Sequence, residues 1–480
     1  MARGRAEHHP GRWPSVQRAR QSRRAGPRDR QVRGPLRAST NRQPVGLAVL
    51  AGTELAERFS YYGMTALLAL YMVKQLLLPG HVEHVIGLAA LRRAFEFRGP
   101  MSDQAFASLI YGWYGGLVYF TPILGGWVAD RWLGIKWTVI FGALLMAAGH
   151  LAMSQDATFL VALVLLIIGS GFLKGNISAQ VGTLYPKDVE SLRERGFTIF
   201  STAINIGAVA GPLATGTVSL VYGWHAGFAL AATLMIAALI VYLLGSRFLP
   251  AQRGHRTVEA SNAPLNRDEK ARTLCLAGVI ALLIPVNVTY PMIWNIGVIW
   301  VDQHVNLTTP FGNVPASWFN SVDSFASIVF APFLVGLWGW QARRKSEPNA
   351  MTKIAIGAAI SGASGFAIAL GSLTASNGRV SVLWPLLGWF GMGLGFMWYW
   401  PIILSLVSRA APERVRARLM GGTFLALFFG SAIMGWVGSF YDEMSNAAFW
   451  ALDGSIALIS ALVILAVSRP VNRILGTAEN

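Results

Sequence analysis

Long apolar stretches recur along the whole chain, and short polar segments separate them. An α-helix needs about 20 mostly apolar residues to cross the hydrocarbon core of a bilayer. About twelve windows meet this requirement, near residues 45–78, 104–128, 136–154, 157–180, 197–221, 226–247, 273–301, 317–340, 351–375, 381–408, 415–437 and 446–468. The pattern predicts an all-α polytopic membrane protein with about twelve transmembrane helices.

The composition agrees with this reading. Of the 480 residues, 54% are hydrophobic and only 13% are charged, which is too apolar for an ordinary soluble protein. Most of the 40 Lys and Arg residues lie in the two tails and in the loops that follow even-numbered spans. By the positive-inside rule, both termini are expected in the cytoplasm of a multi-pass cell-membrane protein. The net charge of +17 therefore needs no nucleic-acid partner.

Residues 1–43 differ from the rest of the chain. They are rich in Arg and are interrupted by Pro and Gly, so we expect a disordered basic tail that contacts anionic lipid. The tail lacks the apolar core of a secretory signal. An over-extended start of translation would produce the same pattern, so its presence in the mature protein stays open. A single cysteine, Cys275, excludes an internal disulfide.

The first apolar span carries charges that a bilayer disfavours. Glu54, Glu57, Arg58, Tyr61 and Tyr62 follow helical spacing, so all five lie on one side of a helix. Each charge in mid-membrane costs about 2.5–3.5 kcal/mol, and such residues usually face a bundle interior or an aqueous cavity. We therefore expect a functional polar face. The alternative is that Arg58 and one Glu form only a packing ion pair.

A glycine-rich segment, residues 125–136, follows the second span. Its arrangement G-x-x-x-D-R-x-x-G-x-K marks the loop between the second and third spans of the major facilitator superfamily. Glycines allow two helices to approach closely. Asp130, Arg131 and their basic neighbours are expected to form breakable ion pairs at an inner gate.

Two later spans add polar candidates. Lys174 follows small residues at 169–171, which would let its helix pack tightly and bring the ammonium near the carboxylates of the first span. The alternative is that Lys174 extends to the inner headgroups. Asn205 lies beside glycines and Pro212, where a polar contact and a helix bend are expected.

These stretches together resemble the proton-coupled oligopeptide transporter family within the major facilitator superfamily. E-x-x-E-R-F-x-Y-Y-G at 54–63 matches at every defined position, and G-x-G-x-x-K-x-N-I-S at 169–178 and I-N-x-G at 204–207 also fit. The second half matches loosely, through A-P-x-R-x-R at 411–416. The resemblance implies the major facilitator fold, with six-helix bundles at 44–248 and 273–480 and a cytoplasmic linker at 249–272.

The resemblance also implies roles. Glu54 and Glu57 would take part in proton coupling, and Arg58 and Lys174 would help to hold a substrate carboxylate. The cavity would further be lined by Tyr62, Tyr119 and Asn205. Independently, two acidic and two basic groups in one cavity form a set whose pairing switches with protonation. None of the eight histidines need lie in the core, so carboxylates are the better proton carriers.

The second half departs from the family pattern where a peptide's amino group would bind. Phe396 stands at the position of the family's tenth-span Glu, and Trp400 at that of a Ser. Asp323 replaces the Asn of an eighth-span Asn-Pro pair, and its carboxylate could take over the ammonium. The pair Trp398 and Trp400 would favour an aromatic or apolar side chain, or bind an ammonium by cation–π attraction.

The outer gate departs as well. Thr65 replaces a frequent Arg in the first span, so Asp302, at the outer end of the seventh span, is expected to lack its usual salt-bridge partner.

The resulting hypothesis is an atypical proton-coupled symporter that imports di- or tripeptides, or a peptide-like solute, as a monomer. One alternative is a carrier or exporter of a non-peptide organic compound, and another is a membrane sensor that does not transport. The chain has no paired metal ligands, nucleophile elbow or phosphate loop, so we expect neither an enzyme nor a metal or other cofactor, with the proton as coupling ion.

Overall fold

The structure is a computed structural model that describes residues 42–185, 190–250, 264–310, 312–375 and 378–476. The predicted tail falls almost entirely outside these residues. The same is true of the central part, 251–263, of the predicted linker.

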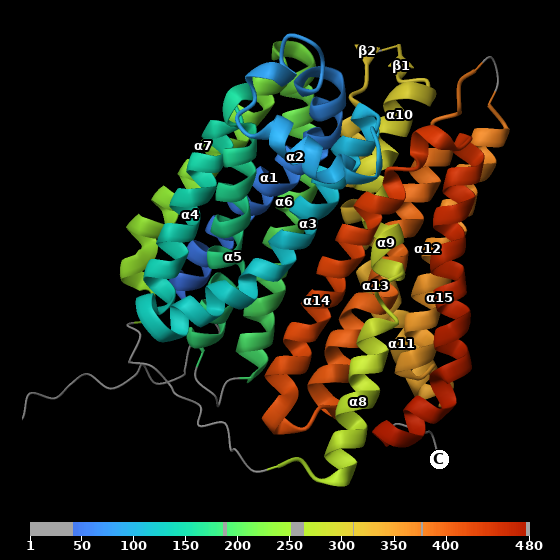
Figure 1. Ribbon diagram of the computed structural model, residues 1–480. Coiled ribbons are helices and arrows are strands. Elements are labelled where there is room, and N and C mark those ends of the chain that lie inside the picture. Colours follow the sequence, from blue (N-terminus) through green and yellow to red (C-terminus); the bar gives the residue numbers. More distant parts are fainter. Residues whose placement is uncertain (1–41, 186–189, 251–263, 311, 376–377, 477–480) are drawn as a thin grey trace, which may run out of the picture. The chain divides into compact units, whose positions relative to one another are not determined.

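Helices make up most of the described chain (Figure 1), and a two-stranded hairpin follows α10. The elements are α1 (Val45–Tyr71), α2 (Leu88–Phe95), α3 (Asp103–Val128), α4 (Gly134–Ala152), α5 (Phe159–Thr183), α6 (Glu190–Tyr222), α7 (Trp224–Gly245), α8 (Arg267–Ala281), α9 (Val286–Met292), α10 (Val298–His304), β1 (Thr308–Thr309), β2 (Gly312–Asn313), α11 (Val322–Arg343), α12 (Ala350–Leu373), α13 (Leu383–Ala410), α14 (Glu413–Gly438) and α15 (Asn446–Leu475). Three π-helical segments continue or interrupt them, at Met72–Leu76, Ala129–Leu133 and Ile293–Gly297.

The described helices account for the predicted membrane crossings. Ten segments are long and apolar enough to span a bilayer, and one of them, Asp103–Ala152, contains both α3 and α4. The 27-residue α1 is not among the ten, because charged and polar residues interrupt its apolar run. Separating α3 from α4 and adding α1 gives twelve crossings, as predicted.

The helices form two bundles. In the first, α1 packs against α6 and α7, while α5 packs against α3 and α4. In the second, α12 packs against α13 and α15, and α9 lies between α14 and α15. The seventh crossing is built from three helices, α8 to α10, and is broken by a turn before Pro285 and by the π-helical segment Ile293–Gly297.

The two bundles meet through backbone-close contacts. An added Cβ at Gly112 of α3 would lie 2.6 Å from the Cα of Gly435 in α14. Ser108 donates to the Gly435 carbonyl (3.0 Å), and Ser321 donates to the Val209 carbonyl of α6 (2.7 Å). These contacts lie toward the end of the bundle that carries Asp302, which we call the Asp302 end. The opposite end, which carries Asp130, is called the Asp130 end.

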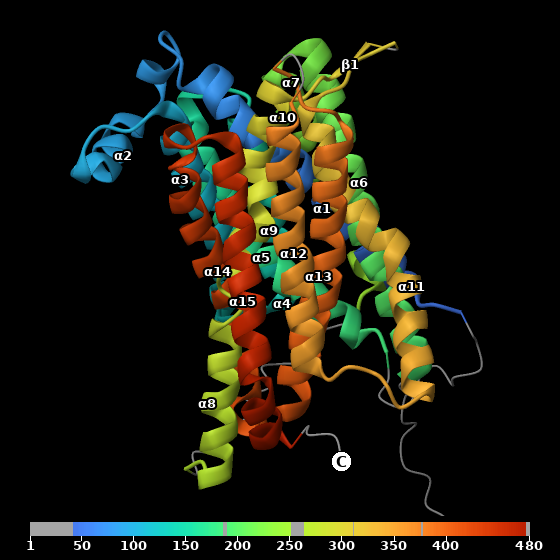
Figure 2. The same ribbon diagram turned by 90° about the vertical axis from the view of Figure 1, so that its right-hand side faces the viewer.

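The segment between α1 and α3 contains the short surface helix that the sequence suggested. Figure 2 shows α2 to the side of α3. Arg92 of α2 donates to Asp103 (2.7 Å) and to Glu96 (2.9 Å), which holds the segment against the start of α3. The hydrogen bond from Arg92 to Glu96 lowers the pKa of the Glu96 carboxyl.

One histidine does lie in the core. His150 of α4 is fully buried, and neither ring nitrogen has a hydrogen-bond partner among the described residues. The helix packs against both α5 and α7, so a residue on its inner side is covered whatever its polarity.

Adjacent glycines in α3 offer a matched test of this packing. A Cβ added at Gly125 would lie 2.1 Å from the Gly171 carbonyl oxygen of α5, whereas one at Gly126 meets nothing within 4 Å. Overpacking of this kind costs about 1–3 kcal/mol. We expect Gly125→Ala to lower the thermal unfolding midpoint in detergent and Gly126→Ala to leave it unchanged. Equal midpoints for the two variants would contradict the close approach of α3 and α5.

Candidate functional site

The polar face of α1 is a compact charge cluster. The Nε atom of Arg58 lies 2.9 Å from Glu54 Oε1 and 2.5 Å from Glu57 Oε2. Glu54 is 3% exposed, Glu57 is 0% exposed and Arg58 is 7% exposed. The Arg58 guanidinium is therefore shared by two carboxylates inside the bundle.

Glycines of α6 bring that helix directly onto the cluster. A Cβ at Gly207 would lie 2.5 Å from the Leu55 carbonyl oxygen and 2.8 Å from Arg58 Cβ. Asn205, which is half-buried, precedes this contact by two residues. Residues two apart on a helix point in nearly opposite directions, so the contact at Gly207 does not place the Asn205 side chain, and its role in the cavity stays a prediction.

Lys174 of α5 completes the charged set in the first bundle. Its Nζ atom lies 3.9 Å from the ring centroid of Tyr61 and 5.6 Å from that of Tyr119. No carboxylate of the described residues lies within ion-pair distance of it. The ammonium thus rests on aromatic faces of α1 and α3, a cation–π arrangement, and does not extend to the headgroups.

The second bundle contributes a single buried carboxylate to this region. Asp323, at the start of α11, is 1% exposed. Its Oδ2 accepts hydrogen bonds from the Tyr290 hydroxyl (2.7 Å) and from the Trp294 indole (3.3 Å). Its Oδ1 is buried without a hydrogen-bond partner among the described residues. A buried carboxylate oxygen without a donor is costly, so this atom is available to a further donor.

Aromatic rings connect the two sets of charges. Tyr62 of α1 contacts Trp294 across the bundle interface, with ring centroids 5.4 Å apart. On the far side of Asp323, Phe396 stacks on Tyr290 at 4.8 Å and on Trp400 at 6.0 Å. Predicted site residues from both halves are thereby brought into one continuous set.

Tyr290 and Trp294 were not predicted as site residues. The signal that could have found both is Asp323 itself, because a carboxylate inside an apolar span requires donors from a neighbouring helix.

The predicted pairing of Trp398 with Trp400 is wrong. Trp398 is 8% exposed and packs against Trp338 of α11, with ring centroids 5.4 Å apart. Residues two apart on a helix point about 200° apart, so the two indoles face opposite sides of α13. Only Trp400 lies with Phe396.

The expectation that Asp302 lacks a partner is also wrong. Lys74 Nζ lies 2.8 Å from Asp302 Oδ2, which links the first and second bundles at the Asp302 end. Lys74 is presented by the π-helical segment Met72–Leu76, which continues α1 beyond the span. Thr65, the position at which a partner was expected, lies about two and a half helical turns earlier.

At the opposite end, the predicted ion pairs of Asp130 and Arg131 are not formed. Both residues are exposed on the π-helical segment Ala129–Leu133. Within the described ranges, neither lies within ion-pair distance of an oppositely charged group. The bundles are linked at the Asp302 end, which leaves these side chains to solvent.

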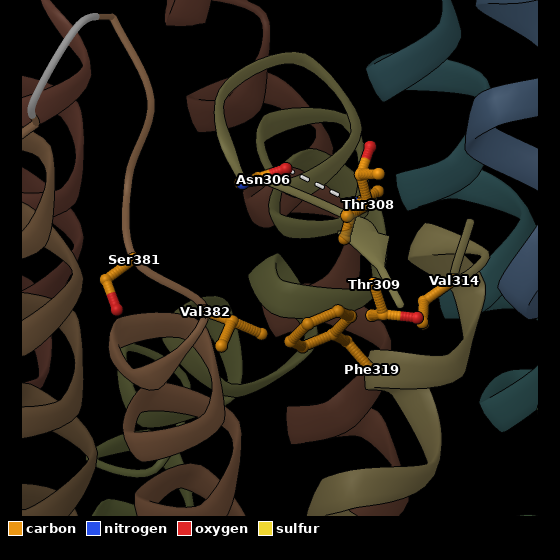
Figure 3. A pocket seen from close by; sticks show the side chains of 8 residues that line it. Asn306, Thr308, Thr309, Val314, Phe319, Ser381 and Val382 are labelled. Atoms are coloured by element: carbon orange, nitrogen blue, oxygen red, sulfur yellow. Dashed lines mark hydrogen bonds between the residues drawn. The ribbon is translucent and has the colours of Figure 1, made fainter. Parts of the chain in front are cut away.

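A surface cavity of about 310 Å³ opens at the Asp302 end (Figure 3). The ring of Phe319, from the 3₁₀ helix Ala316–Ser321, points toward Val382 at the start of α13, while Thr308 lies beside Asn306. Its lining contains no ionisable side chain and none of the predicted site residues. The charged site is therefore separate from it.

Comparison with known proteins gives the family. A model described as the POT family matches residues 136–265 and 261–452. A di-/tripeptide transporter of Lactococcus lactis subsp. cremoris is 30% identical, and the match covers 90% of this chain and 97% of the relative. The chain belongs to the POT family.

Other POT-family proteins are similar over comparable lengths. The peptide transporter YePEPT of Yersinia enterocolitica subsp. palearctica is 26% identical over 91% of this chain and 96% of its own. A crystal structure of a peptide transporter POT in complex with alafosfalin has a TM-score of 0.78 at 26% identity and covers 90% of this chain and 96% of the other. The chain therefore spans nearly the whole length of these relatives.

The Lys74–Asp302 pair can be tested by its effect on the separation of the bundles. Both side chains are partly exposed, so the pair contributes only about 0.2–1 kcal/mol. We expect Lys74→Gln to lower the closed-to-open ratio at the Asp302 end by up to about fivefold. The double change Lys74→Glu with Asp302→Lys should restore it.

The measurement is double electron–electron resonance between spin labels at Val221→Cys and Val382→Cys in a Cys275→Ser background. Both labelled positions are exposed, at 63% and 39%, and they lie on different bundles. If neither variant changes the distance distribution, the pair does not hold the bundles together.

Proposed function

We propose that this POT-family protein is a proton-coupled symporter that imports di- or tripeptides, or a peptide-like solute, by alternating access. The observation that carries the proposal is that basic side chains of one bundle lie across from a buried carboxylate of the other. Arg58 and Lys174 lie in one bundle and Asp323 in the other, joined by the contact between Tyr62 and Trp294. A small peptide carries a carboxylate at one end and an ammonium at the other, which matches this arrangement.

The ammonium would bind to Asp323. Phe396 stands where many family members have a Glu, so the tenth span offers no counter-charge. Asp323 Oδ1 is buried and has no donor among the described residues. A ligand ammonium would supply that donor, and the stacked rings of Tyr290, Phe396 and Trp400 would contact the adjacent side chain.

Proton coupling would reside in Glu54 and Glu57, which share Arg58. While both are ionised, the guanidinium is held between them. Protonation of one removes half of this attraction, and Arg58 becomes available to the substrate carboxylate. The membrane potential would then contribute about 2.3 kcal/mol per charge per 100 mV to uptake.

The conformation supports an assignment of which end of the protein is closed and which is open. The bundles are linked at the Asp302 end by Lys74, while Asp130 and Arg131 are exposed at the other end. We assign this state as open toward the Asp130 end. From the distribution of Lys and Arg, that end and both termini face the cytoplasm, and the chain acts as a monomer in the cell membrane.

A carrier of a non-peptide organic compound is the second candidate. The stacked rings of Tyr290, Phe396 and Trp400 favour it, because they replace a charged subsite with an apolar surface. Such a solute would still use Arg58 and Lys174 if it is an anion.

Purified protein in proteoliposomes would test the proposal. Under an inside-negative potential, addition of di- and tripeptides should acidify the lumen, as reported by a trapped pH dye. Silence across the peptide panel, with protein shown to be folded, would overturn peptide symport and favour the second candidate.

Glu57→Gln tests proton coupling separately from binding. The neutral amide cannot carry a proton, but it keeps the shape of the side chain. We expect proton-driven uptake to be abolished and counterflow exchange of labelled substrate to continue. Driven uptake at the wild-type rate would show that Glu57 does not carry the proton.

Asp323→Asn tests the ammonium subsite. Loss of a charge-assisted hydrogen bond costs about 1.5–3 kcal/mol, which corresponds to a 10- to 150-fold weaker affinity for peptides with a free amino group. N-acetylated peptides lack that charge, and their affinity should change little. Trp398→Phe is the control, because Trp398 faces the other side of α13. An equal loss for free and acetylated peptides would exclude a direct contact with the ammonium.

A further inference from the structure

A second cluster of ionisable groups lies at the Asp302 end, apart from the charges on α1 that the proposed mechanism uses. The Asp156 carboxylate, between α4 and α5, accepts a hydrogen bond from the Tyr71 hydroxyl (2.5 Å). His81 Nδ1 lies 2.6 Å from its Oδ2, and His225 Nε2 lies 2.8 Å from its Oδ1. One carboxylate therefore joins the end of α1, the segment after it, the α4–α5 connection and the start of α7.

Two of these contacts bracket the segment that carries Lys74. Tyr71 is the last residue of α1, and the π-helical segment Met72–Leu76 follows it directly. His81 comes shortly after that segment. Both ends of the stretch are tied to Asp156, so the position of the Lys74 ammonium depends on how firmly Asp156 holds them.

The cluster is fixed on one side and open to solvent on the other. Tyr71 is 0% exposed, and its ring contacts those of Phe159 and Phe228 at 5.9 and 5.0 Å. The side chains of His81 and His225 are 43% and 38% exposed. The histidines can therefore exchange protons with the solution at this end, while the tyrosine anchors the carboxylate to the bundle.

We propose that Asp156 is a positioning residue for the Lys74–Asp302 gate. His81 and His225 make the strength of its hydrogen bonds to the segment that carries Lys74 depend on the pH at the Asp302 end. The inference rests on the proposed gating role of Lys74.

The direction follows from hydrogen-bond chemistry. A neutral imidazole can donate one ordinary hydrogen bond to the carboxylate. An imidazolium donates a charge-assisted bond that is about twice as strong, and histidine is the side chain that ordinarily changes charge between pH 5 and 8. Protonation of either imidazole strengthens its bond to Asp156, so at lower pH the segment is held more firmly and the closed state of the gate gains population.

Neighbouring groups do not substitute for the two histidines. On the 3₁₀ turn Val82–His84, Glu83 accepts a hydrogen bond from the backbone N–H of Gly80 (2.8 Å). His84 is exposed on the same turn and is not among the partners of Asp156. From α5 and α7, the ring contacts to Tyr71 are those of Phe159, Trp224, His225 and Phe228, and His225 is the ionisable one of the four.

The experiment is a pH titration of the Val221–Val382 spin-label distance in lipid nanodiscs, without peptide or gradient. In the otherwise unchanged protein, we expect the closed fraction to rise several-fold between pH 8 and pH 5.5. The double variant His81→Asn with His225→Gln keeps neutral donors near the same positions but cannot titrate there, so its profile should be flat. His84→Asn is the matched control and should titrate like the parent.

The outcomes separate the inference from the proposed function. A flat profile in the parent protein, or a double variant that titrates like the parent, would overturn it. Asp156→Asn and Tyr71→Phe extend the test where they fold, and the double variant is sufficient if they do not. Because no substrate is used, failure of peptide transport in proteoliposomes would leave this result unaffected, and the reverse also holds.

Discussion

The structure depends on one guanidinium shared by two carboxylates within a membrane-spanning bundle. Arg58, Glu54 and Glu57 are all almost fully buried, and removing Arg58 would leave two carboxylates uncompensated in a medium of low dielectric. The glycines of α6 that press against α1 are a consequence, because only a close helix can exclude lipid from such a cluster. The cluster also remains adjustable, since a single cation between two anions has no unique partner.

The second bundle contributes less charge and more aromatic surface to the proposed site than the first bundle does. Asp323 is its contribution to the site, and two donors from the seventh crossing, Tyr290 and Trp294, already orient it. The rings of Phe396 and Trp400 occupy the neighbourhood in which many relatives place a carboxylate. In the proposed site, the negative charge opposite Arg58 and Lys174 therefore comes from α11.

Sequence reasoning predicted the twelve crossings and the charged face of α1 because both follow from periodicity and from the cost of charge in lipid. It failed where the answer depends on a partner distant in sequence. Lys74 reaches Asp302 only because a π-helical segment continues α1, and no local pattern near Thr65 indicates this. Trp398 and Trp400 were judged by proximity along the chain, although helix geometry turns them apart. His150 shows that a polar residue type does not by itself exclude a core position.

The backbone hydrogen bonding of the seventh crossing is interrupted near its middle. Pro291 lacks a backbone donor, and a π-helical segment begins two residues later, so this part of the crossing is not stabilised by its own hydrogen bonds alone. Tyr290 and Trp294, on either side of the break, both donate to the same oxygen of Asp323 on another helix. Asp323 therefore connects the two sides of the interruption through side-chain hydrogen bonds. The proposed ligand ammonium binds to the other oxygen, Oδ1, so binding would leave both hydrogen bonds, and with them the course of the seventh crossing, intact.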